Sequence, residues 1–418
     1  MKDKIRKLIQ KGFFHIFGAN VINKIIGFAS SIFLVRLLSK EEFGVFSYAQ
    51  NLLMIFLLFN ALGATAGMLQ FGSESDVQSR RNEYFKFGLK LGSFFNIIVS
   101  IVFVLFGIFG PVQFEEARPI IVAMCALPLI MFIMESIQIY FRTSLRNKDF
   151  SLLTTTNTAL VFVFSVIGAL LFQALGVVLF RYFAYLLTIL IGIVILKDVT
   201  KDVFKSGKLI YQDKMEFLKF SLAQSFNNSI AQMLYVIDIF IIGLIIADVS
   251  TIASYKTATL IPFALNFIPM SIMVFIYPYF ARNNNNMKWI KCNFIKLTKY
   301  LVIFNALITV FLVVFSKQII EVAFGEEYKD AVIPFIILSI GYFIAASFRI
   351  PIGNILVMMK KVKFGLYLSV ITGVLNVILN IILISDYGSI GAAISTVVVF
   401  LFTSVLGYWY LMRQFKGI

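Results

Sequence analysis

The feature that decides the fold class is an apolar stretch at residues 87–109, which reads FGLKLGSFFNIIVSIVFVLFGIF. An α-helix needs roughly 20 mainly apolar residues to cross a hydrocarbon core about 30 Å thick, and this stretch meets that length with Lys90 as its single charge. Basic residues precede it at positions 80–86, and the pair Glu115–Glu116 follows it. The stretch therefore predicts a transmembrane helix.

The composition of the whole chain points the same way. Of its 418 residues 60% are hydrophobic and 14% are charged, whereas soluble proteins average roughly 45–50% and 25%. A water-soluble fold cannot bury that excess. Cys125, Cys292 and the single histidine, His15, provide neither a disulfide framework nor a His-rich metal site, so we expect no metal and no cofactor. Disulfide scaffolds, zinc enzymes and Ser-His-Asp hydrolases are poor fits.

Eleven further stretches share these properties, so the sequence predicts an all-α integral membrane protein with twelve transmembrane helices. The predicted spans are Phe13–Leu38, Phe43–Phe71, Phe87–Phe109, Pro119–Phe141, Leu152–Phe172, Gly176–Leu196, Phe217–Ile246, Ala253–Tyr279, Tyr300–Phe315, Val332–Met358, Phe364–Ser385 and Ile390–Leu411.

The orientation follows from lysine and arginine, because short loops rich in them stay in the cytoplasm. Basic clusters fall at the N-terminus and then in every second loop, whereas the pairs Glu41–Glu42, Glu115–Glu116 and Glu326–Glu327 fall on the other side. Both termini are therefore predicted to be cytoplasmic. The formal net charge of +16 reflects this topology, so we expect no nucleic-acid partner.

The chain is predicted to divide into two six-helix bundles, residues 1–196 and 217–418, joined by a cytoplasmic linker at 197–216. The linker is basic and polar, which favours a simple connection or a short amphipathic surface helix. Matched residues recur at a constant offset, as in Asn20 with Asn227 and Arg142 with Arg349.

Charged residues inside the spans are mostly positive. Such residues are costly in hydrocarbon and mark functional sites by default. The cations are Lys24, Arg181, Lys256 and Arg349, with Arg142 and Lys90 near the inner boundary, and the carboxylates are Glu135 and Asp238. One interpretation is that these ions pair and hold helices together, but two anions cannot neutralise four or more cations. The surplus indicates an anionic ligand.

Amide side chains follow single helical faces at spacings of three, four and seven residues. These candidate cavity-lining residues are Asn20 and Asn23 in the first span, Gln224, Asn227 and Asn228 in the seventh, and Asn376 and Asn380 in the eleventh. Polar residues also join helices to one another in lipid, which is the alternative for each.

Two motifs resemble a known family. They are Arg36-Leu37-Leu38-Ser39 with Phe43-Gly44, Tyr48 and Leu62-Gly63 near the N-terminus, and Gly388 with Gly391-Ala392-Ala393 at the last span. The chain resembles bacterial polysaccharide flippases, the O-antigen and capsule repeat-unit translocases of the MATE-like superfamily. The resemblance implies two six-helix bundles in a V shape around a central cavity. It also implies a multi-pass protein of the bacterial inner membrane.

The same resemblance implies that undecaprenyl-pyrophosphate-linked oligosaccharide moves from the inner to the outer leaflet, with other polysaccharide-assembly membrane proteins as further partners. Lys24 and Lys256 match cation positions on the first and eighth helices of the related lipid II flippases. The second span, Phe43–Phe71, lacks the cation that those flippases carry on their second helix. Arg142, Arg181 and Arg349 are therefore alternative candidates for binding the pyrophosphate.

The resulting hypothesis is a transporter and not an enzyme. Asp238 and Glu135 are candidates for coupling to protons or sodium, with a structural ion pair as the alternative. A MATE-type multidrug exporter would share the fold, but a positive cavity repels cationic drugs. A polysaccharide polymerase or ligase would need a long outer loop, which the chain lacks.

Overall fold

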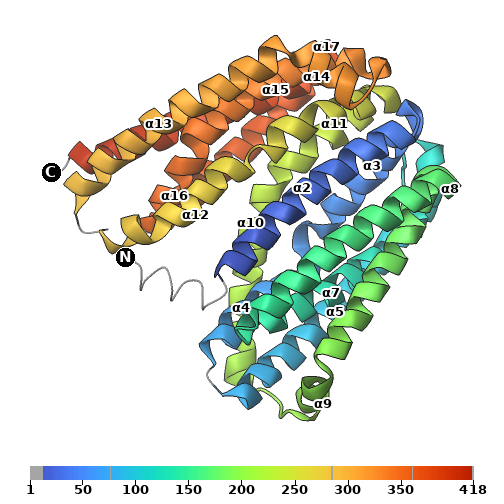
Figure 1. The fold of residues 1–418 in the computed structure, drawn as a ribbon, viewed down its shortest axis with the longest axis vertical. Coiled ribbons are helices and arrows are strands. Elements are labelled where there is room, and N and C mark those ends of the chain that lie inside the picture. Colours follow the sequence, from blue (N-terminus) through green and yellow to red (C-terminus); the bar gives the residue numbers. More distant parts are fainter. Residues whose placement is uncertain (1–12, 76, 284–285, 360, 417–418) are drawn as a thin grey trace. The chain divides into compact units, whose positions relative to one another are not determined.

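A computed structural model describes residues 13–75, 77–283, 286–359 and 361–416. Within these ranges the regular secondary structure is entirely helical, which confirms the predicted fold class (Figure 1). The chain divides into two compact units, Met1–Gln232 and Met233–Ile418. The predicted bundle and linker bounds at residues 196 and 217 stay a prediction.

The first unit begins with α2 and ends inside α10. Its elements are α2 (Phe13–Leu37), α3 (Lys40–Phe56), η1 (Leu57–Gly63), α4 (Ala64–Glu74), α5 (Gln78–Phe109), η2 (Glu115–Ala117), α6 (Arg118–Ala123), α7 (Leu127–Thr143), α8 (Asn147–Ile195), α9 (Lys197–Lys205) and the first part of α10 (Tyr211–Ile245). Phe217 of α10 is fully buried against the rings of Phe71 and Tyr84, which places the start of this helix in the first unit.

The second unit contains the rest of α10 and the helices that follow. They are α11 (Val249–Ala264), α12 (Phe267–Arg282), α13 (Met287–Val314), α14 (Ser316–Ala323), η3 (Glu326–Ala331), α15 (Val332–Ile344), η4 (Ala345–Arg349), α16 (Ile350–Met358) and α17 (Val362–Lys416).

Nine candidate spans in the described residues are long and apolar enough to cross a membrane, or ten when the two bent segments of α10 count as one span. The chain is therefore a multi-pass membrane protein. Two of the nine, α8 and α17, reverse direction within their length, at Gln173 (φ 52°) and Gly388 (φ 55°). Figure 1 shows α8 turning back on itself. Each supplies two arms, and the total of twelve membrane crossings stays a prediction.

Small residues allow these reversals. A Cβ atom on Gly176 would lie 2.0 Å from the carbonyl oxygen of Gly168, and one on Gly391 would lie 2.0 Å from that of Leu383. In a straight helix, residues eight positions apart are about 12 Å apart along the axis. The two arms of each hairpin therefore touch through backbone atoms, and only glycine leaves room for that contact.

Replacing Gly391 with Ala is expected to destabilise the protein by at least about 2 kcal/mol, because the added methyl group overlaps the Leu383 carbonyl group. The midpoint of thermal unfolding in detergent measures the effect. Gly373→Ala is the matched control on α17, since nothing lies within 4 Å of that position. Equal midpoints for the two variants would contradict a close-packed hairpin.

The second predicted span, Phe43–Phe71, is interrupted in the structure by η1. Ala61, Leu62 and Gly63 have positive φ angles of 50°, 49° and 71°. The buried Asn96 side chain holds this break: its amide donates to Asn60 Oδ1 and to a backbone carbonyl of α7, and its oxygen accepts from the backbone N–H of Ala61, each at 2.8 Å. Irregular backbone at membrane depth is tolerated when protein satisfies it.

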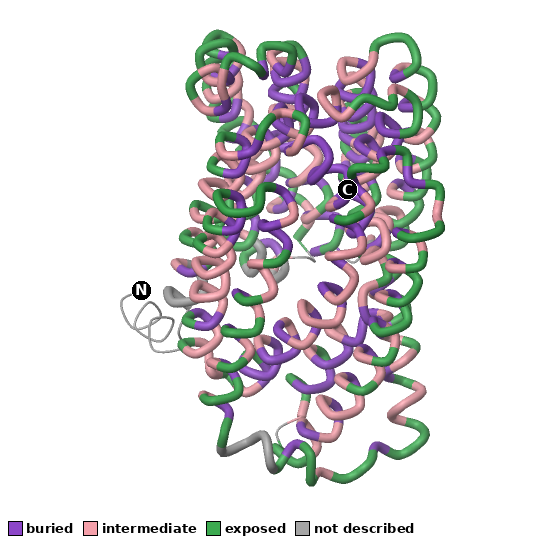
Figure 2. Tube along the Cα trace, turned by 90° about the vertical axis from the view of Figure 1, so that its right-hand side faces the viewer, coloured by how far each residue is buried: buried purple, intermediate pink, exposed green. Residues whose placement is uncertain are grey.

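Large apolar side chains are exposed along the helices and not only in the loops. Phe109 is 80% exposed and Tyr300 is 71% exposed, and Figure 2 shows exposed residues along the lengths of the helices. In water such a surface would drive aggregation. In a bilayer it contacts lipid, which agrees with the membrane location.

Candidate functional site

The five cations predicted for the site have no carboxylate partner among the described residues. The ion pairs of the described residues include Arg80 with Glu83 and Asp213, Arg118 with Glu115, Arg146 with Asp149, and Lys329 with Glu326. Within the described part of the chain, no carboxylate contacts Lys24, Arg142, Arg181, Lys256 or Arg349. Salt bridges to Glu135 or Asp238 therefore do not hold these cations.

Arg181 lies inside the first unit among neutral groups. Its Nε donates to the hydroxyl of Ser165 at 3.2 Å, from the other arm of the α8 hairpin. Its guanidinium carbon lies 5.1 Å from the centre of the Phe46 ring of α3. A guanidinium has five N–H donors, so one hydroxyl contact and a stacking contact leave most of them available to an anion.

Arg349 has the same kind of environment in the second unit. It ends the π-helical turn η4, and such turns often occur at functional sites. Its Nη1 donates to the hydroxyl of Tyr235 at 3.2 Å, and the guanidinium carbon lies 4.7 Å from the centre of the Phe400 ring. The aromatic face orients the cation without neutralising it.

The other predicted cations differ in exposure. Lys24 of α2 is exposed, and Arg142 at the end of α7 is exposed with its guanidinium carbon 5.5 Å from the centre of the Phe150 ring. Lys256 is half-buried on α11 of the second unit. An anion-binding role for each of the three stays a prediction.

The predicted amide residues of the first unit lie mainly on accessible surface. Asn20, Asn227 and Asn228 are exposed, and Asn23 and Gln224 are half-buried. Gln224 donates to the Asn228 side-chain oxygen at 3.4 Å, as their spacing of one helical turn predicts. Accessible amides are suited to polar ligands, and their role in lining a cavity stays a prediction.

Asp238 lies in a closely built polar cluster inside the second unit. It is 2% exposed. Its carboxylate accepts hydrogen bonds from the Tyr255 hydroxyl at 2.6 Å, the Asn380 amide at 2.7 Å and the Thr396 hydroxyl at 2.6 Å. Asn376 lies beside the same carboxylate.

The cluster holds more oxygen acceptors than donors can satisfy. The side-chain oxygens of Asn376 and Asn380 are buried and have no hydrogen-bond partner in the described residues. Two unpartnered buried oxygens beside a carboxylate are costly without a proton or cation. Carboxylate, amide and hydroxyl oxygens together form the donor set that hard cations prefer.

Sequence patterns place Asp238 on the seventh predicted span and Asn376 and Asn380 on one face of the eleventh, and the structure brings the three together. Tyr255 and Thr396 were missed as site residues. Tyr255 directly precedes the predicted site residue Lys256, and Thr396 lies one helical turn after the glycine and alanine residues at 391–393. Neither position carries a charge or a regular polar spacing, so only the helix packing reveals it.

The residues that contact Arg349 lie on the same two helices, α10 and α17, as residues of the Asp238 cluster. On α10, Tyr235 precedes Asp238 by three residues, and on α17, Phe400 follows Thr396 by four. Such spacings are about one helical turn, roughly 5 Å along the axis. The aromatic pair that contacts Arg349 therefore lies one turn from the groups that contact Asp238, although the arginine and the carboxylate form no ion pair.

Glu135 does not join this cluster. It lies half-buried on α7 of the first unit and makes no ion pair or hydrogen bond in the described residues. The structural ion pair considered for it is not observed there. Its coupling role stays a prediction.

Residues 9–284 match the model of the family described as polysaccharide biosynthesis protein. The chain belongs to this family. The chain is also similar to the probable low-salt glycan biosynthesis flippase Agl15 of Haloferax volcanii, with 28% identity over 222 residues, which cover 51% of this chain and 44% of that protein. The match thus spans less than half the length of that relative.

Solved structures establish the fold of this polysaccharide biosynthesis protein. The lipid II flippase MurJ in an inward closed conformation has a TM-score of 0.73 at 16% identity, covering 96% of this chain and 87% of that one. An inward-facing multidrug resistance MATE family transporter of the MOP superfamily has a TM-score of 0.66 at 13% identity, covering 94% and 95%. The MATE-like fold and the resemblance to the flippase superfamily are confirmed.

Proposed function

We propose that this chain is a flippase that moves a lipid-linked glycan across the membrane, and that it is a transporter and not an enzyme. The family description, the name of the Haloferax volcanii relative and the fold shared with the lipid II flippase support this reading. The observation that carries it is the set of membrane cations without carboxylate partners in the described residues.

The proposed substrate is an undecaprenyl-pyrophosphate-linked oligosaccharide for a surface polysaccharide such as O-antigen or capsule. Its pyrophosphate is an anion that arginine and lysine side chains bind through charge-assisted hydrogen bonds. The accessible amides on α2 and α10 replace the hydrogen bonds that sugar hydroxyls lose with water. The polyprenyl chain needs no such compensation because lipid surrounds it.

We place the chain in the bacterial inner membrane with both termini in the cytoplasm, and its cargo moves outward. Export of an anion across an inside-negative membrane is favourable by about 2.3 kcal/mol per charge per 100 mV. A doubly charged head group that crosses the whole field gains roughly 4–5 kcal/mol. The membrane potential therefore assists the proposed direction.

We assign ion coupling to the Asp238 cluster. Its oxygen-bearing side chains suit a sodium ion, and the carboxylate also suits a proton. Uptake of either cation neutralises a buried charge that only uncharged donors now stabilise. MATE-type drug export is disfavoured because cationic drugs and unpaired arginines repel one another.

Liposome reconstitution tests the proposed function. Purified protein is expected to expose a labelled polyprenyl-pyrophosphate oligosaccharide to an external glycosidase faster than empty liposomes do. Lys256→Gln is expected to slow this by about tenfold, since a lost charge contact to phosphate costs about 1.5–3 kcal/mol. Lys296→Gln, an exposed lysine on α13, is the matched control. A rate no faster than empty liposomes would refute the flippase proposal.

A further inference from the structure

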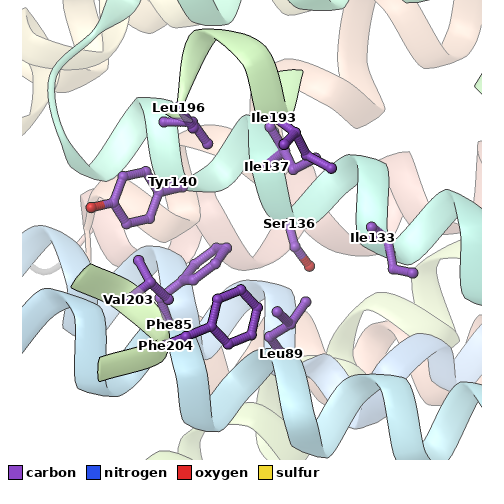
Figure 3. A pocket seen from close by; sticks show the side chains of 10 residues that line it. All are labelled: Phe85, Leu89, Ile133, Ser136, Ile137, Tyr140, Ile193, Leu196, Val203 and Phe204. Atoms are coloured by element: carbon purple, nitrogen blue, oxygen red, sulfur yellow. The ribbon is translucent and has the colours of Figure 1, made fainter. Parts of the chain in front are cut away.

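The first unit contains an apolar pocket outside the cation and carboxylate sites. Its volume is about 240 Å³, and its walls come from α5, α7, the end of α8 and α9 (Figure 3). Two lining residues carry hydroxyls, but Ser136 donates to the backbone carbonyl of Phe132 and Tyr140 donates to Asn82, each at 2.8 Å. No polar atom is presented to the pocket.

The pocket reaches the protein surface. Ile193 at the end of α8 is 44% exposed and Phe204 of α9 is 66% exposed, and both line the pocket. Val203, one residue earlier, is 5% exposed and closes the inner wall. The short helix α9 in the predicted linker thus forms one side of an opening.

Three lysines lie next to lining residues in the sequence. Lys86, Lys90 and Lys205 each directly follow a lining residue, namely Phe85, Leu89 and Phe204. Lys86 donates to the backbone carbonyls of Phe204 and Ser206, each at 2.7 Å, so it fixes α9 to α5 and retains one N–H donor.

The nearby acidic groups do not cancel this charge. Glu83 on α5 pairs with Arg80 at 3.2 Å, and Asp202 on α9 is an exposed acidic neighbour. Long lysine side chains extend from an apolar surface toward the lipid head groups. Lys90 and Lys205 are exposed and can do so.

We propose that this pocket binds one acyl chain of an anionic phospholipid, whose phosphate lies against Lys86, Lys90 and Lys205. A wholly apolar cavity excludes water, and one of about 150 Å³ already accepts a benzene molecule. Hydrocarbon is the apolar ligand that a bilayer supplies, and the basic rim selects a head group with net negative charge. This site is independent of the transported substrate.

Dioctanoyl phosphatidylglycerol is the probe. Added to delipidated protein in detergent, it is expected to raise the unfolding midpoint in a saturable manner, because a ligand that binds only the folded state stabilises it. Dioctanoyl phosphatidylcholine is expected to bind about tenfold more weakly, since its head group has no net charge. Equal binding of the two lipids would overturn the charge-selected site.

Two pairs of variants separate the pocket from its rim. Ile193→Trp fills the opening and is expected to weaken phosphatidylglycerol binding about tenfold, the equivalent of excluding about two methylene groups. Val194→Trp is the matched control, an adjacent, 67% exposed residue that does not line the pocket. Lys90→Gln is expected to reduce the preference for phosphatidylglycerol over phosphatidylcholine without affecting folding. Lys148→Gln, the matched control, is expected to leave this preference unchanged.

Other outcomes would overturn the proposal. Equal binding by the two tryptophan variants would place the lipid elsewhere. An unchanged lipid preference in Lys90→Gln would show that the lysines do not select the head group. Tighter binding of farnesyl phosphate than of phosphatidylglycerol, lost in Ile193→Trp, would make the occupant an isoprenoid and refute the phospholipid.

Discussion

Asp238→Asn is expected to reduce ion-driven transport by about tenfold to a hundredfold, the range of a typical coupling free energy between two sites. The substitution keeps the size of the side chain and removes the charge that attracts a cation. It also introduces an amide N–H₂ group among the donors of Tyr255, Thr396 and Asn380. The new N–H₂ group faces a donor that formerly bonded to the carboxylate, and neither then has an acceptor. Some loss of stability therefore accompanies the loss of coupling.

The measurement is the rate of substrate flipping in proteoliposomes with an imposed sodium gradient, and separately with an imposed proton gradient. The wild-type rate is expected to respond to one gradient and the Asp238→Asn rate to neither. Tyr255→Phe is the control that removes one donor and keeps the carboxylate. An Asp238→Asn protein that still responds to the gradient as wild type does would exclude this cluster as the coupling site.

The apolar stretches predicted the helices well because the bilayer imposes their length. Helix breaks were harder to predict. The break at 57–63 lies within the long apolar span predicted at Phe43–Phe71, and it depends on the Asn96 amide from another helix. The π-helical turn that ends at Arg349 likewise leaves no trace in the hydropathy of the chain. Such features depend on tertiary contacts, which periodicity does not report.

The candidate site was predicted as separate residues and not as a constellation. The high cost of a charge in hydrocarbon was enough to single out Asp238, Arg181 and Arg349. Their partners could not be predicted, since Ser165, Tyr235 and the aromatic rings are common residue types in a chain with 47 phenylalanines. Helix packing decides which neutral hydroxyl groups and rings contact the charged residue, and the sequence does not show that packing.

Arg349 is the residue at which we expect the second large effect. Its guanidinium is held by Tyr235 and Phe400 and has no carboxylate partner in the described residues, so a pyrophosphate can take its remaining donors. Arg349→Gln is expected to weaken binding of a polyprenyl pyrophosphate by about tenfold to a hundredfold, the cost of a lost charged hydrogen bond. Arg349→Lys restores the charge but not the planar fork, so partial recovery is expected.

Arg413→Gln is the matched control. Arg413 is an exposed arginine on α17 of the second unit, and it also stacks on an aromatic ring, that of Trp409. The proposed coupling between Arg349 and Asp238 gives a sharper test. Since the residues that contact Arg349 lie about one turn from Asp238 on α10 and from Thr396 on α17, cation uptake at Asp238 is expected to strengthen anion binding at Arg349 by about 1–2 kcal/mol. In a double-mutant cycle, Asp238→Asn and Arg349→Gln are expected to be non-additive by that amount. Strict additivity would mean that anion and cation sites act independently, and the driving ion would then have to couple to the substrate through another residue.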